Sequence, residues 1–166
     1  MPDIDTRPQA VAVLMATLPD YWWSVDPGDI NVGLSMWTGA VCFHSFHTNP
    51  NDAIDLLVKE VSSGGLKLLV YEAFNLQGFK AAEQHGSEFL TSQMIGAMRH
   101  VCRRAGVPTK SWRPVDHKTI FKKTEHRPPN RPVQEWRSYG QGGHAKDSES
   151  LGEYFVRTVI LKGRGY

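Results

Sequence analysis

A short, nearly continuous apolar run, Leu66 to Tyr71, lies near the middle of this 166-residue sequence. Such a run is typical of a strand that is buried on both faces. A helical pattern precedes it, with Asn49-Pro50 as the start signal and Gly64-Gly65 as the stop signal. A second helical pattern follows it, with apolar residues at spacings of three and four from Phe89 to Cys102. The run and the two helices beside it predict an α/β domain.

Three strands are predicted before the first helix. The first covers Tyr21 to Asp26 and stops at Pro27-Gly28. From Val32 to Trp37 the apolar residues alternate with small or polar ones, which is the period-2 pattern of a half-buried strand. Thr38-Gly39 then turns the chain into a third run, Ala40 to His47, so the second and third strands are expected to form an antiparallel hairpin.

The C-terminal part adds a strand over Ser111 to Val115 and a helix that begins near His144. Between them, residues 122–143 lack periodicity and are predicted to form a long basic loop, which in a compact domain is usually functional or disordered. The order of elements predicts a mixed sheet of about five strands, three antiparallel and then parallel ones, flanked by helices. This domain would cover residues 21–166, after an N-terminal extension over residues 1–20.

The composition bounds the class of protein. A chain of 166 residues is expected to make one domain, and its 40% hydrophobic and 22% charged residues are ordinary for a soluble globular protein. No apolar run is long enough to span a membrane. The N-terminus carries acidic residues where a signal peptide needs positive charge, which predicts a cytoplasmic protein. Cys42 and Cys102 lie among apolar residues and are expected to fill the core.

The net charge of +2 conceals a strong asymmetry along the chain. Residues 1–60 carry two basic and eight acidic side chains, whereas residues 110–146 carry nine basic and three acidic ones. A basic segment that also contains prolines and aromatic residues is typical of a surface that follows a phosphate backbone. A solvated loop explains the charge equally well, so charge alone does not decide between the two.

Three acidic residues occupy positions where folding alone gives no reason for a carboxylate. Asp26 ends the first strand, and Glu72 directly follows the buried run. Asp147 lies one turn before Leu151 on the core-facing side of the last helix, with His144 three residues earlier on the same side. A buried carboxylate is costly unless it is paired or binds a metal, and ligands of α/β sheets bind at the carboxyl ends of strands. A turn cap, a lysine partner or the helix dipole would explain each residue singly, but together they predict a site.

The same residues resemble motifs of the RuvC-type Holliday-junction resolvases, which have a ribonuclease H-like fold. Asp26-Pro27-Gly28 followed by Gly33 resembles the DPGxxxxG first strand of that family. Glu72 in LLVYEAF resembles the acidic residue that ends its fourth strand. The segment from His144 to Asp147 resembles the HxxD pair that opens its final helix. The resemblance extends over residues 22–161 and looks closest to phage-encoded members from actinobacterial viruses.

This resemblance implies a metal-dependent nuclease that cuts branched DNA such as Holliday junctions, flaps and replication forks, in recombination or repair. Two divalent ions roughly 4 Å apart would activate water, neutralise charge at phosphorus and stabilise the leaving oxygen. Asp26 would bridge both ions, Glu72 and Asp147 would hold one each, and His144 would complete a shell or help to activate water. Carboxylates suit Mg²⁺ or Mn²⁺, and a histidine ligand favours Mn²⁺. Since the helix start is placed only approximately, Glu149 could replace or supplement Asp147.

The resemblance also implies a DNA-holding surface. Phe74 lies near the position of the aromatic residue that wedges into the junction in cellular members, but is shifted by one residue. Lys118 loosely matches the family's lysine near the fifth strand. Trp112, Trp136 and Tyr139 are candidates for stacking on unpaired bases. The residues expected to hold phosphates are Arg113, Lys118, Lys122, Lys123, Arg127, Arg131 and Arg137.

A homodimer is expected, because two symmetric nicks in a four-way junction need two active sites. The helix at residues 87–105 is the candidate interface through its stripe of Met and Phe, although such a stripe suits ordinary core equally well. Three other functions compete. An ATP-binding protein of the actin, Hsp70 and sugar-kinase superfamily would need two such domains. A catalytically silent DNA-binding module and a ribonuclease H acting on RNA–DNA hybrids both remain alternatives.

Overall fold

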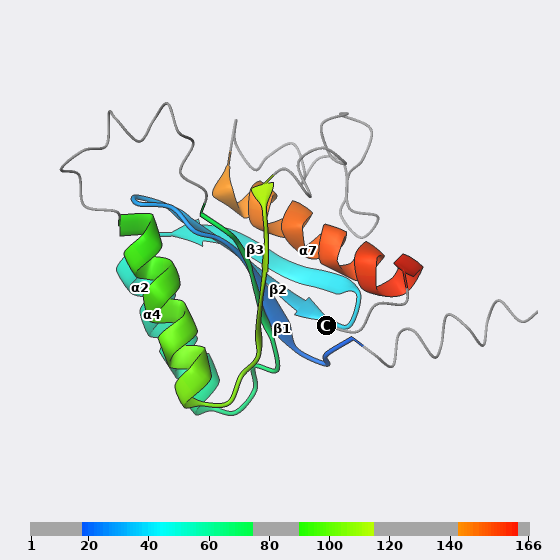
Figure 1. Cartoon of the computed structure of the whole chain (residues 1–166), viewed down its shortest axis with the longest axis horizontal. Coiled ribbons are helices and arrows are strands. Elements are labelled where there is room, and N and C mark those ends of the chain that lie inside the picture. The colour runs from blue at the N-terminus through cyan, green and yellow to red at the C-terminus, as the bar shows by residue number, and fades with distance from the viewer. Residues whose placement is uncertain (1–17, 75–89, 115–142, 163–166) are drawn as a thin grey trace, which may run out of the picture.

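A computed structural model of the chain describes residues 18–74, 90–114 and 143–162, and it shows a sheet with helices on both faces (Figure 1). Two helices cover one face of the sheet and a third covers the other. The pair on one face is α2 (Pro50–Ser62) and α4 (Leu90–Arg104), and the single helix is α7 (His144–Lys162).

The sheet has five strands in the order β3-β2-β1-β4-β5. β1 (Trp22–Asp26) pairs antiparallel with β2 (Val32–Thr38), and β2 pairs antiparallel with β3 (Val41–Thr48). On its other side β1 pairs parallel with β4 (Leu69–Glu72), which pairs parallel with β5 (Thr109–Trp112). The mixed five-stranded sheet with flanking helices confirms the predicted fold class.

The helix signals in the sequence act as expected. The side chain of Asn49 caps α2 by accepting a hydrogen bond from the Asp52 backbone N–H at 3.0 Å, and Pro50 follows in the first turn. Gly64 and Gly106, each with φ of 72°, follow α2 and α4 in the left-handed conformation that glycine adopts without strain.

Alternation along β1 divides the core between the two faces. Trp23 belongs to the cluster on the α2 and α4 face, and Trp22 to the cluster on the α7 face. The Trp22 ring stacks on Trp37 at 5.0 Å between centroids and meets Phe155 of α7 edge-on at 4.9 Å. Each fully buried aromatic side chain stabilises the fold by about 2 kcal/mol or more. These contacts hold α7 against the sheet.

Two strand boundaries differ from the prediction. β4 begins at Leu69, although the apolar run begins at Leu66. Lys67 and Leu68 already make backbone hydrogen bonds to Tyr21 and Trp23, at 2.9 and 3.1 Å, before the regular pairing starts. β5 begins at Thr109 and ends at Trp112, whereas the prediction placed it over Ser111 to Val115. Its pairing with β4 starts directly after Pro108, whose carbonyl accepts a hydrogen bond from Leu69 N at 3.1 Å.

The methionine stripe of α4 packs inside this chain. Met94, Met98 and Cys102 are buried in the cluster on the α2 and α4 face. The stripe is therefore ordinary core, which was the alternative to its use as a dimer interface. Cys42 is buried as well, as predicted.

Several predictions concern segments outside the described residues. These are the N-terminal extension up to residue 17 and the basic loop up to residue 142. Within the described ranges no helix combines the length and apolar character needed to cross a membrane.

Candidate active site

Asp26 is buried at the end of β1, with 5% of its surface exposed. β1 lies at the centre of the sheet, so strands flank this position on both sides. Val25 pairs with Tyr71 of the parallel strand β4, and the next residue of each strand is acidic. Asp26 and the half-buried Glu72 therefore lie beside each other at the same edge of the sheet.

His144, the first residue of α7, contacts Asp26 from the face of the sheet that α7 covers. Its Nδ1 forms a hydrogen bond of 2.7 Å with Asp26 Oδ2, in which the histidine donates when Asp26 is ionised, and the bond joins residues that are 118 positions apart. The His144 side chain is 39% exposed, so one edge of the ring faces solvent. Asp147 lies in the same first turn of the helix. The start of α7 thus brings the HxxD pair to the ends of β1 and β4.

The pKa of Asp26 is raised from 3.8 to about 6. Burial is the largest cause, because it disfavours the charged form, and the negative charge of Glu72 is the next. The charge of Asp147 raises the pKa further, whereas the hydrogen bond and the charge of His144 lower it. These effects place all four predicted site residues in one electrostatic cluster, and a perturbed carboxyl of this kind is typical of functional sites.

The glycines of the DPGxxxxG motif let α7 approach the sheet. A Cβ added at Gly33 would collide with the backbone carbonyl of His144. One at Gly28 would collide first with the Asn31 carbonyl oxygen of its own turn, and would also lie 3.1 Å from His144 Cε1. Any other residue at Gly33 would push the helix start away from β2. The sequence places glycine here because the helix backbone touches the strand directly.

A buried network of hydroxyl groups also fixes the start of α7. Ser148 donates to the carbonyl of Ala145 at 2.8 Å, and its hydroxyl lies 2.7 Å from that of Ser35 in β2. Because Ser148 uses its only proton on Ala145, Ser35 must donate to Ser148 and accept from Ser45 of β3, 2.7 Å away. Ser24 of β1 donates to the Ser148 carbonyl at 2.6 Å. Three strands therefore hold the residue that follows Asp147.

The residue types at the site fit a divalent cation. Three carboxylates and an imidazole suit Mg²⁺ or Mn²⁺, and a cation would neutralise the charge that raises the pKa of Asp26. In the part of the chain that the structure describes, no group of three or more Asp, Glu, His or Cys side chains is arranged to hold an ion. Glu149 is fully buried, and it is not among the groups that shift the pKa of Asp26.

Some predicted DNA contacts lie within the described residues. Phe74 is 38% exposed and follows Glu72 by two positions. Arg113 is exposed just beyond β5. The half-buried Trp112 packs edge-on against Tyr154 of α7 at 5.1 Å between ring centroids. The other predicted contacts lie outside the described residues; they are Lys118, Lys122, Lys123, Arg127, Arg131, Trp136, Arg137 and Tyr139.

Sequence reasoning missed the serine network. Its members come from three strands and a helix, and Ser35 is 113 positions from Ser148, so no local pattern joins them. The alternation gave the wrong signal for Ser35: it predicted a half-buried strand with Ser35 on the open face, whereas β2 is buried on both faces because α7 covers that side.

Comparison with solved structures identifies similar folds in two structures of RuvC from Thermus thermophilus. RuvC in complex with a Holliday junction substrate aligns with a TM-score of 0.61 and 12% identity, over 87% of this chain and 98% of that one. A second RuvC structure aligns with a TM-score of 0.53 and 14% identity, over 86% and 96% of the two chains. No protein-family model and no curated protein matches the sequence.

At these identities the likeness shows the fold. The chain has the α/β fold of RuvC, which is of the ribonuclease H-like type, and the alignment extends over nearly the whole length of both RuvC chains. The fold implied by the sequence motifs is therefore confirmed.

Proposed function

We propose that this protein is a metal-dependent endonuclease that cuts branched DNA, including Holliday junctions, flaps and forks. The observation that carries the proposal is the site itself: Asp26, with a pKa raised to about 6, lies 2.7 Å from His144 and within the electrostatic influence of two further carboxylates. Those two are Glu72 and Asp147. The structural likeness to a RuvC protein in complex with a Holliday junction supports branched DNA as the substrate.

The chemistry suits these residues. Hydrolysis of a phosphodiester needs an activated water, charge neutralisation at phosphorus and a stabilised leaving oxygen, which bound Mg²⁺ or Mn²⁺ supplies. Asp26, Glu72 and Asp147 would hold the ions, together with His144. When the imidazole is neutral and its Nδ1 donates to Asp26, its Nε2 is an acceptor and can take a proton from water that reaches the exposed part of the side chain.

We assign two described residues to the DNA. Arg113 lies just beyond the strand that pairs with Glu72, so its guanidinium can bind a phosphate beside the site. Phe74 presents an exposed ring near Glu72 and can stack on an unpaired base at the branch. The basic side chains of residues 118–137 remain predicted phosphate contacts.

We also propose a homodimer, because two symmetric nicks need two sites. Since the methionine stripe of α4 is used in the core, the partner would have to contact another surface. A phage origin, a role in recombination or repair and action in the host cytoplasm rest on the sequence resemblance and stay predictions.

A gel assay tests the proposal with a four-way junction, a flap, a fork, a linear duplex and an RNA–DNA hybrid, each with Mg²⁺ or Mn²⁺. The wild type should cut the branched substrates. Asp26→Asn should bind the junction without cutting it, because it removes a ligand charge and little volume. Asp55→Asn, an exposed carboxylate on α2, is the matched control and should cut like the wild type.

Each other outcome has a definite meaning. Cutting by Asp26→Asn at the wild-type rate would contradict the site, and full activity in excess chelator would contradict the metal. Junction binding by the wild type without cutting would identify a silent DNA-binding module. Preference for the RNA–DNA hybrid would identify a ribonuclease H.

A further inference from the structure

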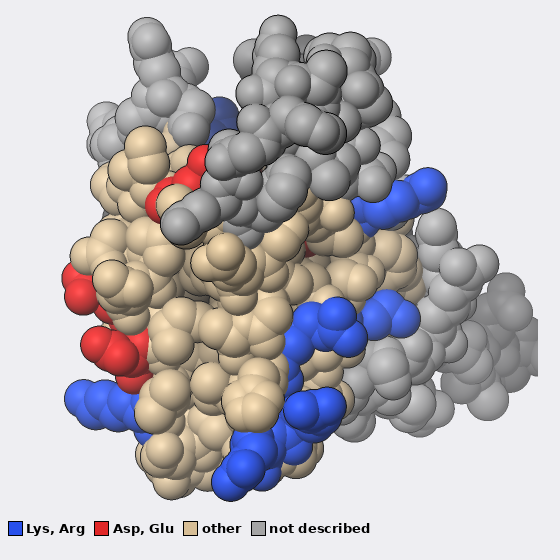
Figure 2. Space-filling view, turned by 60° about the vertical axis from the view of Figure 1, so that its left-hand side comes forward, with Lys and Arg blue, Asp and Glu red and all other residues tan. Residues whose placement is uncertain are grey.

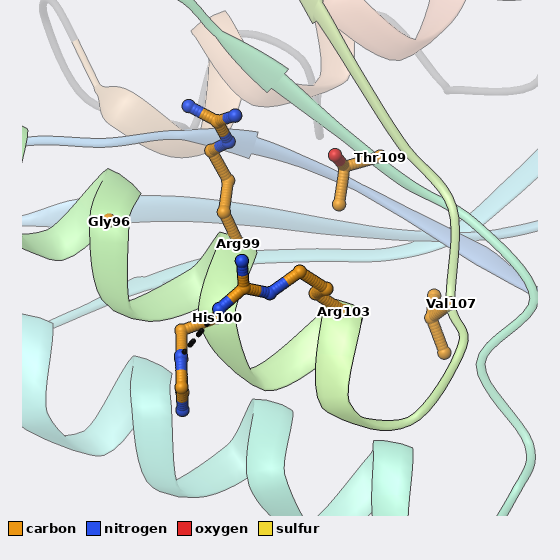
Figure 3. A pocket seen from close by; sticks show the side chains of 6 residues that line it. All are labelled: Gly96, Arg99, His100, Arg103, Val107 and Thr109. Carbon is orange, nitrogen blue, oxygen red and sulfur yellow. Dashed lines mark hydrogen bonds between the residues drawn. The ribbon is translucent and has the colours of Figure 1, made fainter.

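A basic pocket lies away from the candidate active site, on the α4 side of the sheet. Arg99, His100 and Arg103 of α4 line it together with Val107 and Thr109, which follow the helix (Figure 3). Its volume is about 460 Å³, and none of the described residues that line it is acidic. The pocket therefore has the charge and the open shape that suit an anionic ligand.

The two arginines are not explained by folding. They lie four residues apart on the exposed face of the helix, where like charges repel and destabilise the helix by a few tenths of a kcal/mol. Arg103 is in the last turn, where the helix dipole favours a cation, but Arg99 lies before that turn. Within the described ranges neither arginine forms an ion pair with a carboxylate, and Arg103 donates a long hydrogen bond of 3.5 Å to His100 Nδ1 (Figure 3).

β5 connects the pocket with the catalytic edge of the sheet. Thr109, the first residue of β5, lines the pocket, and Trp112, the last, pairs with Glu72. Lys110 lies between them, with its Nζ 5.5 Å from the centre of the Trp112 ring, and Arg113 follows the strand. Alternation along β5 puts Lys110 with Trp112 on the α7 face, and Thr109 and Arg113 on the α4 face. At about 3.3 Å per residue, Arg113 lies roughly 13 Å from Thr109 on the same side as the pocket.

The neighbouring helix has the opposite character. α2 carries Asp52, Asp55 and Glu60 against Lys59. In Figure 2 the red side chains gather at the left of this face, and most of the blue ones form a band over its lower and right-hand parts. An extended polyanion would be repelled by α2 and attracted along α4 and β5.

We propose that the pocket and the β5 edge bind the phosphate backbone of one duplex arm of the DNA substrate. Arg99 and Arg103 bind phosphates through their guanidinium forks, Thr109 donates through its hydroxyl, and Arg113 adds a further cation at the other end of β5. A length of roughly 13 Å corresponds to about four base pairs of axial rise, so the phosphates at the pocket lie about that far along the arm from the phosphate at Arg113. The inference rests on the proposed function, because it takes the arm from a branched substrate held at Asp26.

The test measures binding of the full-length protein to a labelled four-way junction across a range of salt concentrations, by fluorescence anisotropy. An Asp26→Asn background prevents cutting. Adding Arg99→Gln and Arg103→Gln should lower the magnitude of the log–log salt slope by about 1.8, since each lost phosphate contact removes about 0.9. Lys59→Gln with Lys67→Gln, two exposed lysines away from the pocket, is the matched control and should leave the slope unchanged.

A chemical change in the DNA locates the contact. Neutral methylphosphonates placed about four base pairs from the branch should weaken binding of the protein that retains both arginines, but weaken the double-arginine variant no further. Equal slopes in the two proteins would overturn the inference. So would an equal loss of binding to single-stranded DNA, because the proposed ligand is a duplex arm.

Cutting by the wild type is measured separately, which keeps the two proposals apart. A wild type that cuts junctions, with a slope independent of the two arginines, overturns the arm-binding inference alone. A slope that depends on the arginines in a protein that cuts no DNA supports the binding surface and contradicts the nuclease.

Discussion

The two faces of the sheet are packed in different ways. On the α2 and α4 face the buried cluster is apolar, with side chains such as Leu57 and Met98. On the α7 face an apolar cluster is joined by buried hydroxyl groups, among them Ser24, Ser35 and Ser148. The first face is held by non-directional burial and the second also by hydrogen bonds of fixed length and direction.

The difference in packing corresponds to which helices supply residues of the candidate site. Apolar packing tolerates changes of shape at small cost, whereas a fully satisfied polar network specifies one arrangement. α7 supplies His144 and Asp147 to the site, so its position along the sheet decides whether they reach Asp26. The helices of the other face supply no residue of that cluster. The buried hydrogen bonds therefore lie between the sheet and α7, the helix whose position decides the geometry of the site.

The largest effect on cleavage is expected from Gly33→Ala, which changes the contact between β2 and the start of α7. The new Cβ meets backbone atoms of His144 and Ala145, which cannot rotate away as a side chain can. We expect loss of detectable cleavage and a free energy of unfolding lowered by about 3 kcal/mol. Gel cleavage and urea denaturation measure both.

Gly96→Ala is the control for that change. Gly96 is exposed in α4 and a Cβ there meets nothing within 4 Å, so alanine should stabilise the helix by up to about 1 kcal/mol. Wild-type cleavage by Gly33→Ala would show that the start of α7 need not touch β2.

Met98→Ala changes the packing of the opposite face of the sheet, which α2 and α4 cover. The side chain is 2% exposed in the apolar cluster, and its truncation should lower the free energy of unfolding by about 2–5 kcal/mol. The protein that remains folded should cut DNA at the wild-type rate and need no more metal. A raised metal requirement would show that the α4 face also positions the site, and would end the contrast between the faces.

How much the sequence predicts also differs between the faces. Apolar periodicity was sufficient for α2, for α4 and for the side of α7 that faces the sheet, because burial of apolar residues leaves a regular trace. Asp26 and Glu72 were also predictable, since a carboxylate directly after a buried strand is unusual. The end of β5 was misplaced because its residues, Thr109 to Trp112, are only half-buried or exposed.

The serine network and the basic pocket were not predictable from local pattern. Ser35 and Ser148 are ordinary residues until the fold brings their hydroxyls to 2.7 Å. The pocket joins Arg99 to Thr109 across the turn that ends α4, and Arg99 by itself resembles any exposed helix residue. Tertiary structure, and not propensity, creates both features.

The free energy of unfolding is expected to depend on pH through Asp26, on the α7 side of the comparison. The folded state keeps the Asp26 proton up to about pH 6, whereas the unfolded chain loses it near 3.8, so the folded state binds more protons between these values. The free energy of unfolding therefore falls as pH rises through this window, by about 3 kcal/mol for a shift of two units.

Asp26→Asn removes this penalty. In metal-free buffer it should be more stable than the wild type by up to about 3 kcal/mol at pH 7, and the difference should vanish below about pH 4. Urea denaturation of both proteins at the two pH values measures it, and the contributions of ionisable groups that do not interact with Asp26 cancel. A difference that stays constant with pH would mean that the Asp26 carboxylate is ionised without cost.

The smallest change in stability, and the most informative, is expected from Ser148→Ala. The substitution removes the acceptor of the Ser35 hydroxyl but leaves the apolar contacts of α7 in place, so the free energy of unfolding should fall by only about 1 kcal/mol. Loss of a residue that orients metal ligands typically costs 10–100-fold in metal affinity or activity, and we expect such a drop at limiting Mn²⁺. Excess Mn²⁺ should restore much of the rate, because the ligands themselves remain.

Ser92→Ala, exposed on α4, should change neither quantity. Met98→Ala would then lower stability without raising the metal requirement, whereas Ser148→Ala would raise the metal requirement with only a small loss of stability. If Ser148→Ala lost stability and kept its metal requirement, the hydroxyl network would be ordinary core, and the two faces would differ in composition only.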